Sequence, residues 1–473
     1  MHVAVSGTKR SVKSTRTRTM HQCLRSREIL QIIVQNIPTG QVYNSFLDTT
    51  PGSEANHVGL ATLASMAQTC RAFTEPAVDK LWRELPGVEP LILLLPANSW
   101  TFQSFTNGRN EFVLTRALLP EDWKRVNYYG PRVVSLSWRD GRSSFDLPVE
   151  TFRQIALYRR TATLLPNLRA LEWCSQAPNL PYIHLFLNPT VTELNFIISN
   201  DWYEGILDEV LPTIPPLCPR LLSFKFYTSS VICLPIPIPT SSPIIWALES
   251  LRTLYVRTAI ESSDTLLQWS AMPSLQTLRL DCSPISVPLP PLNTPCFSSL
   301  RRLELLNIQF DASLLEFFRF IHPENLTHLE IQTNSRLGAQ DVLELYDEVS
   351  RFITLDTLII NIFSEHILPA YLASILHLPL LRTFHLVNPH QELDDEAISD
   401  IANAFPSLRN LRLKFCKYHS VTIGGLLPLA RRCKHLERLA LNHLRNAAQL
   451  YAFSSSAFQL QTRSSARLRR AGR

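Results

Sequence analysis

The chain has 473 residues, a formal net charge of +6 and a 45% apolar composition, which is ordinary for a folded protein. No apolar run approaches the roughly 18 residues of a membrane-spanning helix, and the N-terminus lacks the apolar core of a secretory signal. The nine cysteines have no regular spacing, so they predict reduced, buried thiols and an intracellular protein, cytoplasmic or nuclear.

The positive charge is concentrated at the two ends. Residues 1–19 and 463–473 each carry five Lys or Arg and no acid. Subtracting these ten charges leaves −4 for the rest, so a nucleic-acid surface is not indicated. Residues 1–19 are predicted to be a disordered basic tail, with a nuclear localisation signal or a mitochondrial transit peptide as alternatives. Residues 446–473 are predicted to be a basic C-terminal tail.

Two helices are predicted near the N-terminus. Segment 23–37 has apolar residues three or four positions apart, which is typical of one helix face, and Pro38 and Gly40 end it. A polar loop follows. A second helix is predicted from about Val58 to Cys70, because its apolar residues recur at helical spacing.

Three phrases in this region carry a family resemblance. They read Glu-Ile-Leu-x-x-Ile-Val-x-x-Ile, Leu-Ala-x-Met-Ala-x-Thr-Cys-Arg-Ala-Phe and Pro-Ala-Val-Asp-x-Leu-Trp-Arg-Glu-Leu. Together they resemble an F-box over residues 20–85. The usual Leu-Pro opening of the first helix is replaced by Arg25-Ser26.

The resemblance implies a small all-α module that docks on a Skp-type adaptor, which in turn holds a cullin-based ubiquitin ligase. The apolar side chains that could form the docking face are Ile29, Leu30, Ile33, Val34, Ile37, Leu63, Met66, Cys70, Phe73 and Trp82. The alternative is that they form only the core of the module, and the sequence does not separate the two sets.

A repeated phrase fills the chain after a junction, residues 86–130, which is predicted to cover the first coil. The phrase has apolar residues at its first, fourth and sixth places, as in Leu408–Cys416. Copies from Leu251 onward start 24 to 29 residues apart, the period of leucine-rich repeats. The twelve starts are Val133, Leu168, Val191, Leu221, Leu251, Leu275, Leu300, Leu326, Leu355, Leu381, Leu408 and Leu436.

Residues 131–445 are therefore predicted to form an α/β solenoid, a leucine-rich-repeat horseshoe with a parallel sheet inside and helices outside. Helices are predicted over residues 311–321, 340–352, 394–405 and 420–433, with Asp394 as an N-cap. Two proline-dense segments, Leu234–Pro243 and Pro284–Pro295, are predicted to be extended or looped. The whole architecture resembles fungal F-box proteins with C-terminal leucine-rich repeats.

The ninth place of the phrase predicts the turn out of each strand. It holds Asn334 in one repeat and Cys416 in another, and other residue types in most of the rest. A continuous Asn ladder is absent from this pattern. An irregular coil is therefore expected.

A target-binding face is predicted from the residues between and beyond the buried places, which line the concave side. The predicted target-binding residues are Lys225, Tyr255, Arg257, Arg279, Glu304, Glu330, His385, Arg412, Lys414 and Arg438. Arg412, Lys414 and Arg438 form a basic patch suited to an acidic or phosphorylated segment. The alternative is a solvated sheet face with no partner.

No catalytic motif, metal site or cofactor is predicted. The sequence contains no phosphate-binding glycine loop and no Gly-x-Ser-x-Gly elbow. Cys416, His419, Cys433 and His435 are metal-ligand types, but a repeat turn and a helix end account for the two cysteines. The prediction is a non-enzymatic substrate receptor. A repeat scaffold with a degenerate F-box is the alternative, and an enzyme on a repeat frame is a third.

Overall fold

A computed structural model describes most of the chain between residues 26 and 442. The described ranges are 26–39, 53–104, 109–139, 145–159, 161–175, 177–198, 206–228, 248–257, 263–281, 296–365, 367–415 and 421–442. Both tails and the two proline-dense segments lie outside these ranges. The chain divides into two compact units, Met1–Pro86 with Arg132–Val134 (unit 1) and Gly87–Pro131 with Ser135–Arg473 (unit 2).

Unit 1 is a small helical module. Its elements are α1 (Arg27–Gln35), α2 (Ser53–Thr69), α3 (Arg71–Trp82) and the short strand β1 (Glu84–Leu85). Ser26 is the N-cap of α1, because its side chain accepts a hydrogen bond from the Ile29 amide. The predicted all-α module is confirmed, although α2 begins before the predicted Val58.

The core of unit 1 is built around Val34, Leu63 and Ala77, one residue from each helix. Arg132 adds a polar clamp on α3, since its guanidinium donates to Glu75 Oε2 at 2.7 Å and also to Asp79. Residues 132–134 thus belong to unit 1, whereas the sequence pattern placed them in the repeats.

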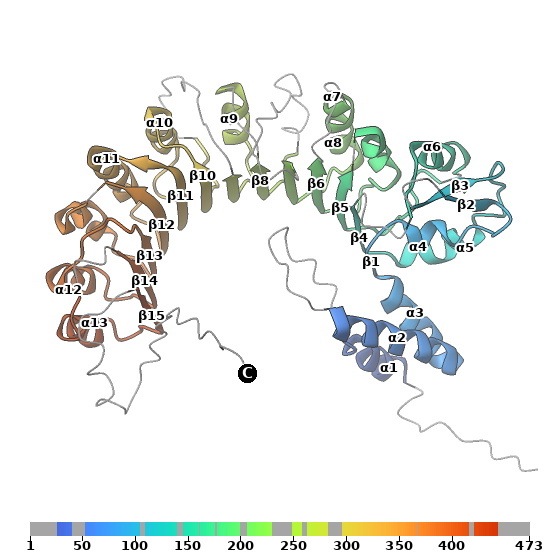
Figure 1. The fold of residues 1–473 in the computed structure, drawn as a ribbon, viewed down its shortest axis with the longest axis horizontal. Helices are drawn as coiled ribbons and strands as arrows, with labels where there is room; N and C mark the ends of the chain where they lie inside the picture. Colours follow the sequence, from blue (N-terminus) through green and yellow to red (C-terminus); the bar gives the residue numbers. More distant parts are fainter. Residues whose placement is uncertain are drawn as a thin grey trace, which may run out of the picture. The chain divides into compact units, whose positions relative to one another are not determined.

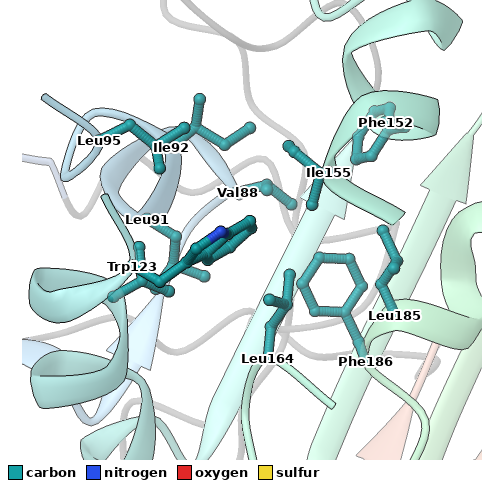
Figure 2. A pocket seen from close by; sticks show the side chains of 11 residues that line it. Val88, Leu91, Ile92, Leu95, Trp123, Phe152, Ile155, Leu164, Leu185 and Phe186 are labelled. Atoms are coloured by element: carbon teal, nitrogen blue, oxygen red, sulfur yellow. The ribbon is translucent and has the colours of Figure 1, made fainter. Parts of the chain in front are cut away.

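Unit 2 opens with two short helices and a hairpin. These are α4 (Glu89–Ile92), β2 (Trp100–Ser104), β3 (Asn110–Leu114) and α5 (Lys124–Tyr129). The 3-10 turn η2 (Gly130–Arg132) follows, and its last residue, Arg132, belongs to unit 1. The Phe112 ring stacks on Trp100 and Phe145, with centroid distances of 5.0 and 5.8 Å. The side chains of Leu91, Ile92 and Trp123 face Phe152 and Phe186 (Figure 2), so this segment covers the first repeats.

The repeats form one parallel sheet in which β4 to β15 follow each other in chain order. In unit 2 the strands lie along the inner side of an arc and the helices along its outer side (Figure 1). The strands are β4 (Ser135–Arg139), β5 (Ala170–Ser175), β6 (Glu193–Ile198), β7 (Ser223–Thr228), β8 (Thr253–Arg257), β9 (Thr277–Asp281), β10 (Arg302–Ile308), β11 (His328–Leu337), β12 (Thr357–Ser364), β13 (Thr383–Val387), β14 (Asn410–Lys414) and β15 (Arg438–Leu441).

The outer side mixes α-helices with 3-10 turns. They are α6 (Val149–Tyr158), η3 (Ala177–Leu185), α7 (Ile206–Val210), η4 (Leu211–Thr213), α8 (Ile214–Leu217), α9 (Ser263–Ser270), α10 (Ala312–Phe320), α11 (Ala339–Ser350), η6 (Pro369–His377), α12 (Asp395–Ala404), η7 (Gly424–Leu426) and α13 (Leu427–Arg432). The predicted helices at 311–321, 340–352 and 394–405 are confirmed, and the stretch predicted at 420–433 forms η7 followed by α13, from Gly424 to Arg432. Asp394 caps α12 as predicted, because its carboxylate accepts from the Ala397 amide at 2.8 Å.

The repeat phrase explains the packing of the solenoid. In the repeat that begins at Leu168, the first, fourth and sixth residues are Leu168, Leu171 and Trp173, and all are essentially fully buried. The same places are buried in almost every copy, so the leucine-rich-repeat solenoid is confirmed. Register shifts in the β10–β11 and β11–β12 pairs fit the irregular coil that was expected.

The predicted role of Asn334 is wrong. Asn334 is exposed and lies inside the ten-residue strand β11, so it does not turn the chain out of its strand. The reason is that β11 pairs with β12 again beyond their register shift, through Arg336 and Leu337. The other predicted turn residue, Cys416, lies outside the described residues.

Tyr346 offers a direct test of how the core of the repeats is packed. Its ring is fully buried in α11, and its hydroxyl finds no hydrogen-bond partner among the described residues. Because a buried, unpaired hydroxyl is desolvated without compensation, Tyr346→Phe should keep or raise the free energy of unfolding, by up to about 1 kcal/mol. Urea unfolding measures this, with the exposed Tyr158→Phe as a control that changes nothing. A clear loss of stability would show that the hydroxyl is paired.

Candidate functional site

The apolar residues of α1 divide into a buried and an exposed set. Leu30 and Val34 are each 2% exposed and belong to the interior, whereas Ile29, Ile32 and Ile33 are 38%, 58% and 37% exposed. Residues spaced three and four apart share one helix face, so the three isoleucines form one surface, named here the α1 face. Ile32 was missed from the sequence, although its spacing from Ile29 marked it.

The other predicted docking residues lie deeper in unit 1. Leu63 is fully buried and serves the core of the module, as Leu30 and Val34 do. The rest of the predicted set is partly buried: Ile37, Met66, Cys70, Phe73 and Trp82. Of the predicted adaptor residues, only Ile29 and Ile33 are therefore open to a partner over a large part of their surface.

The residues between the fourth and sixth places form one continuous row across the sheet. Each is the register partner of the next. This inner column consists of Glu172, Asn195, Lys225, Tyr255, Arg279, Glu304, Glu330, Ile359, His385, Arg412 and Ala440. The structure thus brings together seven of the ten predicted target-binding residues, and Arg257, Lys414 and Arg438 lie two positions away along their strands.

Glu304 corrects one expectation about this surface. It lies in the inner column but is only 5% exposed, because two arginines cover its carboxylate. Arg279 Nη1 lies 3.1 Å from Oε2 and Arg302 Nε lies 2.5 Å from Oε1. Both oxygens are therefore engaged inside the protein.

A second set of contacts ties Tyr255 into the same region. Its hydroxyl donates to Asp281 Oδ2 at 2.9 Å, and the Arg279 guanidinium lies 4.7 Å from the centre of its ring. Asp281 also accepts from Asn307 Nδ2 at 2.7 Å and lies 3.9 Å from the Arg257 guanidinium. Burial and the Asp281 carboxylate raise the pKa of Tyr255, so the phenol stays protonated and donates.

Glu304, His328 and Glu330 are the one group of metal-ligand types that comes together in the described part of the chain, with their ligand atoms within 4.8 Å of one another. Histidine and carboxylates are suitable zinc ligands. However, Arg279 and Arg302 already neutralise Glu304, and a cation placed beside two guanidinium groups is repelled. The group is better described as a compensated ion-pair network.

The environment of this network shifts the pKa values of His328 and Glu330. Burial and the nearby Arg302 lower the pKa of His328 to about 4, so the imidazole is neutral at pH 7. Burial and the Glu304 charge raise the pKa of Glu330. Both shifts follow from packing within the sheet.

The cysteine–histidine cluster of the sequence is not assembled by the described residues. Cys416 and His419 lie outside them. Cys433 is 3% exposed, and its thiol donates to the Phe405 carbonyl at 3.4 Å, while burial raises its pKa. His435 is exposed. Cys433 therefore has a packing role.

The hollow between the first helices of unit 2 and the first repeats is also accounted for by packing. It is lined by apolar side chains such as Val88, Leu164 and Leu185 (Figure 2). The centre of a water molecule has about 20 Å³ of free space there, which is room for about one water. The hollow is too small for an organic ligand.

Comparisons with known proteins carry no argument about the function of this chain. No protein-family model matches the chain, and no curated protein matches it. Many solved structures are similar to it, and three of them illustrate the low identity. An internalin from Listeria monocytogenes is 12% identical over 67% of this chain and 69% of that chain, with a TM-score of 0.31. A leucine-rich-repeat protein from Leptospira interrogans is 16% identical over 70% and 71%, with a TM-score of 0.32.

The third is a chain of the complex of Rad7 and Elc1 in yeast. It is 14% identical over 93% of this chain and 93% of that chain, with a TM-score of 0.32. Values this low support no inference about function. No helix of the described ranges is long and apolar enough to cross a membrane.

The His328 environment makes the solenoid's stability depend on pH. Since the folded-state pKa of about 4 lies below the ordinary value of 6.5, the unfolded chain binds more protons between these values. Lowering the pH from 7 to 5 should therefore cost wild type about 1–2 kcal/mol that His328→Gln does not lose. Urea unfolding at both pH values measures this, with the exposed His435→Gln as the control. An identical pH dependence in wild type and His328→Gln would contradict it.

Proposed function

We propose that the chain is a non-enzymatic substrate-recognition subunit of a Skp–cullin–F-box ubiquitin ligase, acting in the cytoplasm or nucleus. In this proposal unit 1 docks on a Skp-type adaptor, and the inner face of the solenoid binds the target protein. The observation that carries it is the α1 face, which exposes three isoleucines within the segment that resembles an F-box.

Helix-face burial is the physical basis of the adaptor contact. Fully burying one isoleucine contributes about 1.5–3 kcal/mol, so the α1 face can supply much of the energy of a stable contact. The core of unit 1 is formed by other residues, Val34, Leu63 and Ala77, so the α1 face is not needed to hold the helices together. These two roles fall on different sides of the same helix.

The solenoid offers a broad and rigid surface for a target. Ion pairs and hydrogen bonds among Tyr255, Arg279, Asp281 and Glu304 hold inner-face side chains in place, which lowers the entropy cost of binding. The perturbed pKa values of Tyr255, His328 and Glu330 follow from burial and neighbouring charges within this network. Such a subunit contributes by positioning its target beside chemistry that other subunits perform.

A repeat scaffold with no ligase role is the second candidate. The observation in its favour is the start of α1, where Ser26 caps the helix in place of the Leu-Pro opening of the F-box pattern. On this alternative the α1 face would contact some other apolar surface.

Co-purification with a Skp-type adaptor separates the two candidates. Wild type should retain the adaptor, and Ile32→Asp/Ile33→Asp should weaken the complex at least about 100-fold, because two charges are placed in a buried contact. The matched control is Ile353→Asp/Leu380→Asp, which changes two side chains of unit 2 that are 54% and 53% exposed. It should retain the adaptor. Circular dichroism shows that all proteins are folded.

Two results would overturn the receptor proposal. One is a wild-type protein that retains no adaptor. The other is equal loss in the α1-face variant and its control.

A further inference from the structure

The arginines on the strands from β4 to β10 are paired with acids, whereas Lys225 on β7 lies between Asn195 and Tyr255. Arg279 and Arg302 bind Glu304, and Arg257 lies beside Asp281. At the first strand Arg139 Nε lies 2.5 Å from Glu172 Oε1. Each arginine on these strands thus has an acidic neighbour. The arginines of this part of the sheet therefore present little net charge to a partner.

The last two strands differ. Arg412 and Lys414 on β14 and Arg438 on β15 are exposed, and none has an ion-pair partner within residues 367–415 and 421–442. The acid beside them, Glu437, is engaged by Arg409 at 3.3 Å. These three cations are named here the basic row. Arg412 and Arg438 line a groove together with His385, Asn410 and Glu437, and Lys414 lies two residues beyond Arg412 on β14.

The chain's own ends carry no charge that could neutralise the basic row. Residues 443–473 contain no Asp or Glu and several arginines, and residues 1–19 are likewise basic without an acid. The segment 416–420 between β14 and the last repeat also lacks an acid. None of these three segments therefore supplies a carboxylate to the basic row.

The spacing of the three cations in the basic row restricts the class of ligand that can pair with all of them. Lys414 is two residues beyond Arg412 on one strand, and Arg438 is the register partner of Asn410, two residues before Arg412. Since a strand rises about 3.3 Å per residue, the row advances in steps of about 7 Å along the strand direction. Alternate side chains of an extended peptide have the same spacing on one face.

We propose that the basic row binds an extended segment of the target protein that carries Asp or Glu at alternate positions, one carboxylate for each of Arg438, Arg412 and Lys414. This inference rests on the proposed function, because it names the class of target segment. Charge-assisted hydrogen bonds from the two guanidinium groups provide the strongest contacts.

Peptide binding to the full chain tests the proposal. The probe is a fluorescently labelled Thr-Glu-Thr-Glu-Thr-Glu-Thr, compared by anisotropy with an isomer whose three Glu are consecutive. Wild type should bind the alternating peptide several-fold more tightly. Arg412→Gln/Lys414→Gln/Arg438→Gln should weaken its binding at least about tenfold. The matched control, Arg169→Gln/Arg252→Gln/Arg301→Gln, removes three exposed positive charges from earlier repeats and should change it less than about twofold.

Several outcomes would overturn the proposal. Equal loss in the two triple variants would mean attraction by net charge alone, and equal affinity for both peptides would remove the spacing argument. Tighter binding of a single-stranded oligonucleotide that displaces the peptide would reassign the row to nucleic acid. Adaptor co-purification of the same variants separates the two proposals. If the protein retains the adaptor but does not bind the peptide, only this inference is contradicted. If it binds the peptide but retains no adaptor, the receptor proposal is contradicted.

Discussion

Burial of the first, fourth and sixth residues of the repeat phrase is the constraint on which unit 2 depends. Side chains alternate between the two faces of a strand, so fixing Leu171 and Trp173 in the interior fixes Glu172 on the inner face. Because neighbouring strands pair in parallel and in register, the same choice in each repeat aligns the intervening residues into the inner column. The composition of the binding surface therefore follows from the packing of the core.

Charge pairing then decides which part of that surface is open to a partner. Glu304 shows the effect, since a carboxylate at an inner-column position becomes buried once two arginines cover it. Such pairs bring specificity of arrangement more than net stability, because desolvation offsets much of the attraction. At Arg412 and Arg438, which form no ion pair with the described residues, the same strand geometry leaves cations exposed. Repeats that share one sequence pattern thus differ in the net charge that their inner-face side chains expose.

The sequence predicted the solenoid well because its signal is local and repeated. Each copy of the phrase independently indicates the same strand, and Asp394 marks a helix start by chemistry that acts within three residues. Properties that depend on contacts between residues far apart in the chain could not be predicted from the sequence. The contact of Arg279 with Glu304, the clamp from Arg132 to Glu75, and the pairing of β11 with β12 past Asn334 all involve partners at least 25 residues away. The division of α1 into core and exposed sides required the packing of α3 against it.

The division of α1 into a buried and an exposed side bears directly on the F-box resemblance. An apolar helix near an N-terminus can always be assigned to its own core, so the sequence alone leaves docking and packing equivalent. Once Leu30 and Val34 are assigned to the interior, Ile29, Ile32 and Ile33 remain as the apolar side chains of α1 that are partly open to solvent. A contiguous exposed apolar face is costly to leave in water, because it promotes nonspecific association. Its persistence on a helix whose fold does not need it is the physical reason to look for a partner.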